Sequence, residues 1–476
     1  MTDIEFAWSA LGGDPALLAR VSTVVREGAL PARLPVRELA RACVGVCALA
    51  GAELGARRAG LAEAPRVRVD DGAVATAFVS ERHLLIDGRA PVGFAPLSRF
   101  WRTADGWVRT HANYPHHRAR LLRALDLGPS EDPAAVESAL AGRAALEVEE
   151  AVYAAGGLAV ALRTPKEWAG HEQAAQIARR PLVESARVDS ARARALPPLD
   201  GASPLLPAAG LRVLDLTRVI AGPVATRTLA LLGADVLRVD APHLPELPDQ
   251  QADTGFGKRS AALDLGVDRR TFEELLGAAD VVVTGYRPGA LDRFGLSPEA
   301  LAERRPGLVV AQLSAWGAYG PWGGRRGFDS LVQVATGIAA IEGTAGQPGA
   351  LPAQALDHGT GYLLAAAVLR ALTERSAEGH GRVLRVALAR TAAWLTEGPR
   401  PEQASPRRPR PGAARSGQEE AGAPYDSQVA QTWLSETDSR IGRLRYALPP
   451  VSFAGGPDDW ARPPGPWGAD PARWEN

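Results

Sequence analysis

From residue 211 onward the sequence alternates short apolar runs with segments of helix length. The runs LRVLDL, DVLRVD, ADVVVTGY and GLVVAQLSAWG are separated by stretches such as VATRTLALLGA. This alternation is typical of βαβ units, which form a parallel sheet with helices on its faces. Ligands of such sheets bind beyond the carboxyl ends of the strands. The pattern therefore predicts an α/β core with its chemistry in the loops LTRVIAGPVA, TGYRPG and QLSAWGAYGP.

Charge and composition narrow the kind of partner that the chain can have. The chain has 476 residues, 46% of them hydrophobic, which is enough for a sizeable core and two or three structural units. Lys plus Arg and Asp plus Glu both number 54, so no overall field favours nucleic acid or a membrane surface. The start MTDIEFAWSALGGD lacks a basic region followed by an apolar run. We expect no nucleic-acid or membrane partner and a cytoplasmic location.

The cysteines do not indicate a metal or redox site. Cys43 and Cys47 are the only two in the chain, and they would share one face of a helix. No cluster of histidine or carboxylate side chains lies near them in the sequence. We expect two buried small side chains, no metal and no redox cofactor.

The two halves of the chain resemble each other in one region. ELGARRAGLAEAPRVRVDDGAVATAF can be aligned with ALTERSAEGHGRVLRVALARTAAWL, which matches Arg58 with Arg375 and Arg68 with Arg385. Both copies predict a helix, a turn, a strand and a second helix. The first copy has Ala40 where this alignment places Asp357. The first copy would also be truncated, because too few residues precede it to supply the strands of the second.

Two stretches interrupt the globular pattern, around 188–210 and 397–424, and both are rich in Pro, Ala and Arg. Past them, Trp460, Trp467 and Trp474 among many prolines predict an extended tail packed over a surface. We divide the chain into a truncated first-copy late half at 1–80, a small domain at 81–190, a linker at 191–210, the core at 211–396, a disordered linker at 397–430 and the tail at 431–476.

The first strand and its turn do not fit a dinucleotide-binding fingerprint. Asp240 closes the second strand where a ribose-binding acid would lie, but Gly222 is the only glycine in the first turn. Three glycines are needed to bring the backbone against a pyrophosphate. A helix N-terminus at this turn can still attract a phosphate or a thioester oxygen.

An ordered series of motifs in the second half resembles the family III CoA-transferases and their racemase relatives. The series runs from LRVLDLTRVIAGPVATRTLALLGADVLRVDAP through GKRSAALDL, ADVVVTGYRPGALDRFGL and PGLVVAQLSAWGAYGPWGGRRGFDSLVQVATGIA to ALDHGTGYLLAAAVLRALTERSAEGHGRVLRVALA. The resemblance implies a Rossmann-like parallel sheet with a smaller α+β domain. It further implies coenzyme A as a substrate rather than a cofactor, with acyl-CoA and carboxylic acids as the molecules that exchange it.

The resemblance also implies which residues form the site. Asp357 matches the catalytic aspartate, which attacks the acyl-CoA to give an acyl–aspartyl anhydride and then an aspartyl-CoA thioester. From its position alone, Asp357 could equally be the N-cap of a helix. The CoA moiety would be held by Arg218, Ala221, Lys258, Arg259, Gly285, Tyr286, Arg287, Arg293 and Phe328. The cations among them suit the phosphates of CoA.

Some residues depart from the family pattern and keep two alternatives open. Racemase relatives have a histidine at the position of Phe328, so the loss of this acid/base group disfavours an acyl-CoA racemase, isomerase or dehydratase. Gly257 and Gly285 replace asparagines that are common in the family. A non-catalytic CoA-binding homologue therefore also remains an alternative.

The order of the halves is unusual for the family, because the small domain lies upstream of the core. Relatives form interlaced dimers in which the partner completes a site. We expect one site per chain, built from the core and the upstream small domain, in an intrachain pseudo-dimer or a homodimer. His116 and His117 of the small domain are expected to face solvent.

Overall fold

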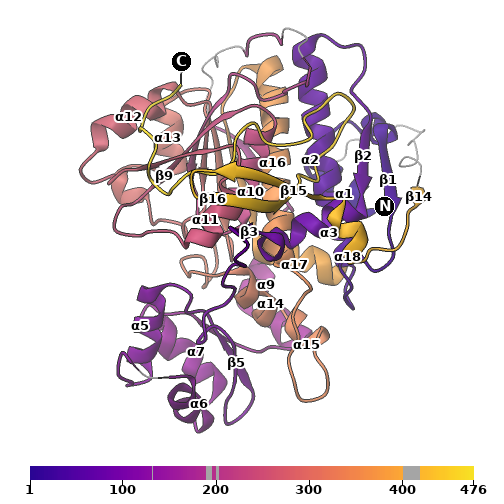
Figure 1. The fold of residues 1–476 in the computed structure, drawn as a ribbon. Helices are drawn as coiled ribbons and strands as arrows, with labels where there is room; N and C mark the ends of the chain where they lie inside the picture. The colour runs from indigo at the N-terminus through magenta and orange to yellow at the C-terminus, as the bar shows by residue number, and fades with distance from the viewer. Residues whose placement is uncertain (131, 189–195, 200–202, 400–418, 476) are drawn as a thin grey trace.

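A computed structural model describes residues 1–130, 132–188, 196–199, 203–399 and 419–475. Its centre is a seven-stranded sheet (Figure 1). In spatial order the strands are β10 (Arg259–Ala262), β9 (Asp235–Asp240), β8 (Arg212–Leu216), β11 (Val281–Thr284), β12 (Val309–Ser314), β13 (Arg382–Ala387) and β7 (Glu184–Arg187).

The topology of this sheet is that of a doubly wound α/β fold. All neighbouring pairs from β10 to β13 are parallel, and only the edge strand β7 runs antiparallel. The first parallel strand of this sheet in the sequence is β8. The chain proceeds from β8 outward to β9 and β10, and then returns to β11 on the other side of β8. The carboxyl ends of β8 and β11 therefore flank the switch point at which such sheets bind ligands. The predicted Rossmann-like core is confirmed.

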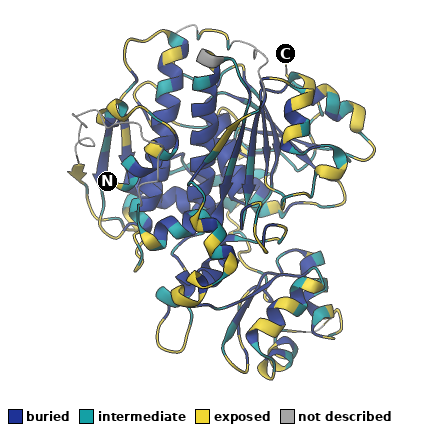
Figure 2. Ribbon diagram, turned by 180° about the vertical axis from the view of Figure 1, so that it is seen from behind, coloured by how far each residue is buried: buried dark blue, intermediate teal, exposed yellow. Residues whose placement is uncertain are grey.

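Alternating side chains bury both faces of the sheet, as the blue strands in Figure 2 show. Val213 and Val281 pack on one face against α10 (Ala221–Leu231) and α16 (Ala355–Glu378). Leu214 and Val282 pack on the other face against α12 (Arg269–Ala278) and α13 (Pro298–Arg304). Strands that are buried on both faces read as continuous apolar runs, which is why VVVT and RVLDL gave a clear signal.

A helix from the start of the chain completes the first of these layers. Helix α2 (Val36–Ala59) packs along α16, and both are 24 residues long. Each ends at a left-handed glycine, Gly60 with φ 67° and Gly379 with φ 80°. Helix α2 is long and apolar enough to cross a membrane, but 94% of its apolar window is buried inside the molecule. Cys43 and Cys47 lie fully buried on it, as expected.

The elements around α2 form a small parallel sheet. Its order is β14 (Glu419–Ala421), β1 (Val21–Val25) and β2 (Val67–Asp70). Nearby lie α1 (Asp3–Ala10), η1 (Pro15–Arg20) and α3 (Asp71–Phe78). Strand β2 and helix α3 follow α2 as β13 and α17 (Leu388–Glu397) follow α16. The order helix, strand, helix that was expected for both aligned copies is thus present in both.

The small domain forms the lower lobe in Figure 1 and has its own hydrophobic core. An antiparallel sheet of β4 (Phe100–Arg102), β5 (Trp107–Thr110) and β6 (Ala159–Ala161) carries α5 (Pro115–Ala124), α6 (Pro133–Ala141) and α7 (Ala145–Ala154). This is the α+β arrangement that the resemblance implied. The chain then returns to the core through α8 (Pro165–Ala169) and α9 (Glu172–Ala178).

The C-terminal residues contain more regular structure than their prolines indicated. Strands β15 (Leu434–Ser439) and β16 (Gly442–Ala447) form a hairpin, which pairs with β3 (Leu85–Ile86). Past the hairpin the chain is extended, and the indole N–H groups of Trp460 and Trp474 donate to the carbonyls of Arg227 and Leu275. The prolines cluster after the hairpin, so they do not prevent its ladder from forming.

The segment 397–430, which was expected to be a disordered linker, is described only in part. Residues 400–418 lie outside the described part of the chain. Of the remainder, β14 pairs with β1, and α18 (Ser427–Gln431) begins at the N-cap Asp426. The described part of this segment therefore contains regular structure that composition alone did not predict. The other short elements are α4 (Ser80–His83), α11 (Pro248–Thr254), η2 (Asp292–Phe294), α14 (Asp329–Ala335) and α15 (Ile338–Ile341).

Candidate active site

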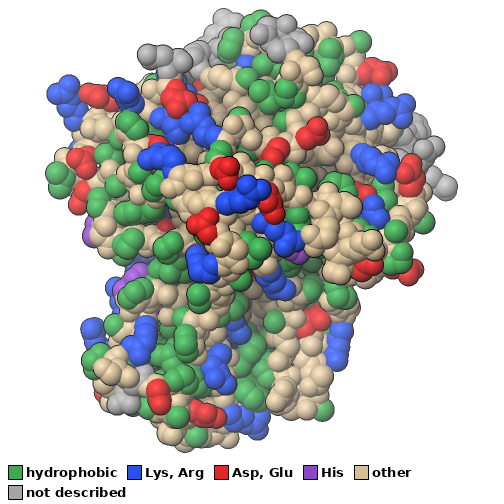
Figure 3. Space-filling model, viewed as in Figure 1, with side chains coloured by type: hydrophobic (Ala, Val, Ile, Leu, Met, Phe, Trp, Pro, Cys, Tyr) green, Lys and Arg blue, Asp and Glu red, His purple; other side chains and the backbone are tan. Residues whose placement is uncertain are grey.

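A cavity of about 590 Å³ opens at the carboxyl ends of β8 and β11, between the core and the small domain. In Figure 3 a histidine side chain lies among Lys and Arg side chains at the left edge, near the junction of the two lobes. Most of the residues expected in the site line this cavity: Arg218, Ala221, Gly285, Tyr286, Arg287, Arg293, Phe328 and Asp357. Loops that follow neighbouring parallel strands meet at one edge, which explains this convergence.

The turn after β8 brings backbone into the cavity wall. Val219 has a φ of 71°, which is unusual for a β-branched residue, and its N–H donates to Oε2 of Glu246 at 3.1 Å. A Cβ at Gly222 would lie 2.4 Å from Cβ of Thr217, so only glycine fits there. The turn is therefore held in one conformation, with Ala221 facing the cavity at the start of α10.

Asp357 reaches the same wall from α16. It is the third residue of that helix and is 6% exposed. One turn further on, a Cβ at Gly361 would lie 2.5 Å from the carbonyl oxygen of Ala221. The close approach of α16 to the turn after β8 thus requires this glycine, and it places Asp357 beside Ala221 in the cavity.

A second buried acid faces Asp357. The backbone N–H of Asp357 donates to Oδ2 of Asp329, the first residue of α14, at 2.9 Å. Burial raises the pKa of Asp329 to about 6, although hydrogen bonds from the Asp357 N–H and Gln333 oppose the shift. Burial also raises the pKa of Asp357 well above the usual range, and the negative charges of Asp329 and Glu81 add to this rise. The pair therefore holds a proton at pH values where isolated carboxyls have lost theirs.

A histidine and a glutamate lie behind this pair. His358 is fully buried, stacks on Phe78 with ring centroids 5.2 Å apart, and has its Nε2 3.8 Å from Oε2 of Glu81. Burial works in the opposite direction, but the His358 imidazole keeps the pKa of Glu81 below its usual value. Glu81 lies on α4, so the N-terminal part of the chain contributes to the electrostatics of Asp357.

Two expected CoA-binding residues do not reach the cavity. Lys258 donates to Oδ2 of Asp215 at 3.0 Å and to the carbonyl of Pro223 at 2.9 Å, and its side chain is 2% exposed. Burial lowers its pKa to about 8, against the opposing effect of Asp215. Arg259 forms a two-pronged contact with Asp235. Both cations are already neutralised by carboxylates of the core, so the expectation that they bind CoA phosphates is corrected.

Arg218 lines the cavity but is held by the core. Its guanidinium lies 3.5 Å from Glu246 and donates to the carbonyl of Pro245 at 2.9 Å. Glu246 is buried and also accepts hydrogen bonds from Arg238 and from the hydroxyl of Tyr114. The sequence did not indicate this role. Since Tyr114 belongs to the small domain, this carboxylate ties the two lobes together at the cavity.

The small domain supplies side chains that the sequence did not assign to the site. Tyr114, His116, His117 and Arg120 all line the cavity. The expectation of a solvent-facing histidine pair is wrong for His117, which is 5% exposed. Burial lowers its pKa to about 2, and His116 adds to the effect, so the imidazole is neutral. The available signal was a histidine pair that follows Tyr114 after one proline.

Phe328 packs against this group of histidines. Its ring is stacked on that of His111, with centroids 3.7 Å apart and planes 8° from parallel. His111 is buried, and burial lowers its pKa to about 3. Phe328 thus occupies its position as an apolar contact between the lobes, with no acid/base group of its own.

The first copy has a different arrangement at the corresponding place. Counted along the helix, Glu38 of α2 is at the third position, as Asp357 is in α16, and Ala40 lies two residues further on. Glu38 accepts from Arg37 at 2.9 Å. Around it Arg26 pairs with Asp70 at 2.8 Å, and Arg41 pairs with Asp71 at 2.6 Å. Ion pairs fill this edge of the small sheet.

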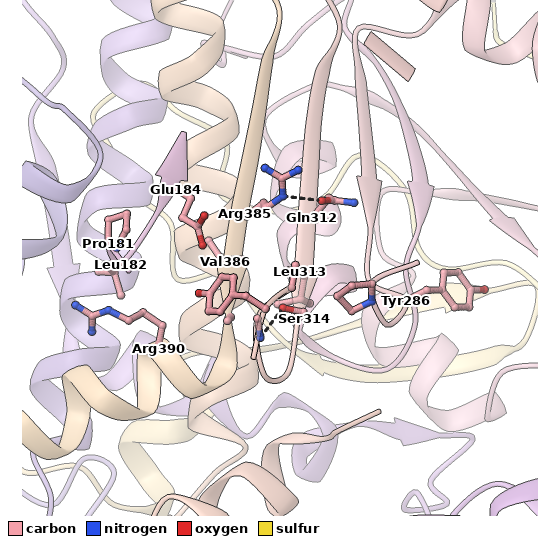
Figure 4. A pocket seen from close by; sticks show the side chains of 15 residues that line it. Pro181, Leu182, Glu184, Tyr286, Gln312, Leu313, Ser314, Arg385, Val386 and Arg390 are labelled. Atoms are coloured by element: carbon pink, nitrogen blue, oxygen red, sulfur yellow. Dashed lines mark hydrogen bonds between the residues drawn. The ribbon is translucent and has the colours of Figure 1, made fainter. Parts of the chain in front are cut away.

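A second, much smaller cavity lies beside the main one (Figure 4). Its volume of about 30 Å³ is enough for a water-sized group. Arg385 donates to Gln312 at 3.1 Å across it, and Leu313 and Tyr286 separate it from the main cavity. Among the described residues no group of three or more His, Cys, Asp or Glu side chains could hold a metal ion.

The fold and the cavity define an α/β protein with a Rossmann-like sheet, a ligand cavity at the switch point and a buried pair of carboxyl groups in its wall. Residues 208–432 match the family model of CoA-transferase family III. This match agrees with the resemblance that the motifs of the second half carry.

Proteins of known name that resemble the chain agree with this assignment. The probable fatty acyl-CoA transferase Rv3272 of Mycobacterium tuberculosis is 36% identical over 40% of this chain and 53% of its own length. A formyl-CoA:oxalate CoA-transferase of Streptomyces coelicolor is 36% identical over 38% of the chain and 47% of its own length. The chain thus spans about half the length of the curated relatives it matches.

Solved structures include a similar protein. A crystal structure of Rv3272 from Mycobacterium tuberculosis is 35% identical to the chain, with a TM-score of 0.38 over 41% of this chain and 58% of the other.

The raised pKa of Asp357 predicts a stability cost. The folded state holds the Asp357 proton to higher pH than the unfolded state, so stability falls as pH rises above the unfolded value of about 4. Asp357→Asn should therefore stabilise the protein at pH 8, by on the order of 1 kcal/mol, and much less at pH 5. Thermal denaturation at both pH values measures this. An equal change at both would show that the carboxyl is not titrating.

Lys258 and Arg287 should behave in opposite ways. Lys258→Met leaves Asp215 buried without its partner and should cost about 3–5 kcal/mol of stability. Arg287→Gln, at the cavity, should leave stability unchanged and weaken CoA binding. Thermal denaturation and calorimetric titration with CoA separate the two effects. A Lys258→Met protein of normal stability with weakened CoA binding would restore Lys258 to the binding site.

Proposed function

We propose that the protein transfers CoA from an acyl-CoA thioester to an acceptor carboxylic acid, with Asp357 as the nucleophile. The observation that carries this proposal is a buried carboxyl in the wall of a cavity at the switch point, in a segment that matches the family model of CoA-transferase family III. Relatives whose names state transfer of CoA from formyl-CoA or succinyl-CoA support the reaction class.

The proposed chemistry proceeds by exchange at two carbonyl carbons. The ionised carboxylate of Asp357 attacks the thioester carbonyl, the C–S bond breaks, and CoA leaves as a thiolate. The thiolate attacks the aspartyl carbonyl of the resulting anhydride and expels the donor carboxylate, leaving an aspartyl-CoA thioester. The acceptor carboxylate attacks the carbonyl of this thioester and releases the CoA thiolate, which leaves a second anhydride between Asp357 and the acceptor. The thiolate then attacks the acceptor's carbonyl in that anhydride, which forms the new acyl-CoA and releases the Asp357 carboxylate.

The surroundings of Asp357 destabilise its carboxylate anion, which makes that anion a better nucleophile. Burial and the neighbouring acids raise its pKa, so the carboxylate is more basic than one in water. The N-termini of α10 and α14 and the backbone of Gly327 supply N–H groups near the same wall. Such groups are suited to stabilise the oxyanion that forms when a carbonyl is attacked.

We infer further that one chain makes one such site. The core supplies Asp357 and Arg287, and the upstream small domain supplies Tyr114 and His117. The matching lengths and glycine caps of α2 and α16 support a fused, truncated first copy. Ion pairs at the first copy's sheet edge, such as Arg41 with Asp71, argue against a second site there.

A racemase reaction is less well supported than transfer. The position next to Asp329 is taken by Phe328, and the nearest imidazoles belong to the small domain, where burial keeps His111 and His117 neutral. Exchange of the Cα hydrogen of an acyl-CoA with solvent deuterium would nevertheless favour the racemase, isomerase or dehydratase alternative.

Covalent trapping tests the proposed transfer. Incubation with an acyl-CoA followed by hydroxylamine should convert Asp357 to a hydroxamate, which peptide mass spectrometry detects. The Asp357→Asn variant, which keeps the size of the side chain, should release no CoA and give no modified peptide. An unmodified Asp357 with no CoA release by the wild-type protein would rule out this mechanism.

The pH dependence of transfer should follow the coupled pair. Because the nucleophile must be ionised, kcat/KM should fall as pH drops through the raised pKa range of Asp357 and Asp329, the latter about 6. Asp329→Asn keeps an oxygen to accept the Asp357 N–H but removes the like charge, so the acid limb should move to lower pH. Glu137→Gln, an exposed change on α6, is the control and should leave the profile unchanged.

A further inference from the structure

Three side chains from two parts of the chain line one side of the cavity, and none has an acidic partner among the described residues. His116 and Arg120 lie on α5 of the small domain, and Arg326 lies in the core segment GGRRGFD just before α14. All three line the cavity, together with Arg287 from the turn after β11. Burial and the charges of Arg120, Arg218 and Arg326 lower the pKa of His116, which places these groups within electrostatic reach of one another.

Two other arginines around the cavity, Arg218 and Arg325, are neutralised by carboxylates, whereas Arg120 and Arg326 are not within the described residues. Arg325 donates to Glu150 at 2.7 Å, and Arg218 is paired with Glu246. In the part of the chain that the structure describes, Arg120 donates to the carbonyl of Gly156 at 3.2 Å and to no carboxylate. Within the described ranges, the guanidinium of Arg326 makes no hydrogen bond or ion pair with the protein. Among the described residues, Arg120 and Arg326 thus share with Arg287 and Arg293 the lack of an acidic partner at the cavity, and Arg120 differs from the others in coming from the small domain.

The positive charges of these side chains act against one another. Burial lowers the pKa of Arg326, and the charges of Arg287 and Arg120 lower it further. Like charges that face one cavity repel each other unless an anion lies between them. The cluster also spans the two lobes, because α5 belongs to the small domain and the segment before α14 belongs to the core.

We propose that Arg120, Arg326 and His116 form an oxyanion site between the small domain and the core, which binds an anionic group of the substrate. Guanidinium groups bind phosphate and carboxylate oxygens through paired N–H donors, and a neutral imidazole can add one more donor. The group is either the diphosphate of CoA or a carboxylate of the exchanged acid. This proposal rests on the proposed function for the identity of the substrate.

The site has a structural consequence. An anion held by Arg120 on one side and Arg326 on the other pulls the small domain toward the core over the cavity. The same contact would orient the ligand relative to Asp357, because Arg326 is only a few residues before Asp329, which accepts the N–H of Asp357. A ligand that lacks the anionic group should bind without this orientation.

Calorimetric titration of the full chain tests the site with four probes: CoA, pantetheine, inorganic diphosphate and succinate. The variants are Arg120→Gln and Arg326→Gln, with Arg326→Lys as the conservative change. Arg123→Gln is the matched control, since Arg123 lies exposed on the same helix α5 and does not line the cavity. Unchanged thermal denaturation confirms that the variants are folded.

If the site takes the diphosphate, both Gln variants weaken CoA and inorganic diphosphate by about tenfold or more, with a shallower salt dependence, and leave pantetheine unchanged. If it takes a carboxylate, succinate is the probe that is weakened. Arg326→Lys recovers part of the affinity, and Arg123→Gln has no effect. Equal affinities of wild type and both Gln variants for every anion would overturn the proposal. Binding of diphosphate that depends on Arg326, with no binding of CoA, would keep the site and refute the proposed function.

Discussion

Helix α2 lies along α16 with side chains that are almost all buried, and this contact fixes where Asp357 stands. The two helices meet through small residues, so that Gly359 of α16 approaches Leu39 and Cys43 of α2 closely. On its other side α16 is held against the turn after β8 by the lack of a side chain at Gly361. Because α16 is closely packed on both sides, a change in side-chain volume at either contact is transmitted to Asp357. The N-terminal segment therefore supports a carboxyl group that lies more than three hundred residues away in the sequence.

The electrostatic pattern of the molecule divides cations into two groups. One group is buried and paired with carboxylates of the core, and it consists of Lys258, Arg259 and Arg238. These side chains stabilise the core and are not available to a ligand in the cavity. Arg287 and Arg326 face the cavity and have no acidic partner in the described part of the chain. A chain with equal numbers of acidic and basic residues can thus still present a local positive site, because the pairing is uneven in space.

The sequence predicted the core well because its signals were local. Strands buried on both faces gave apolar runs. Tyr286, Arg287 and Asp357 were assigned to the site by the family resemblance, and all three line the cavity. Lys258 was misplaced because a cation after a strand looks the same whether it meets a ligand or Asp215. Tyr114 and Glu246 were missed because their contact joins two lobes, and no periodicity in either segment encodes it. The hairpin of β15 and β16 was obscured by the prolines that follow it.

Because the small domain and the core belong to one continuous chain, the two sides of the cavity are present in a fixed ratio and at a high effective concentration. A site assembled from separate chains loses one wall when the protein is diluted. Here Tyr114 remains tethered to the lobe that carries Glu246 at any dilution. Separating these two walls is therefore an intramolecular step, whose equilibrium constant contains no protein concentration.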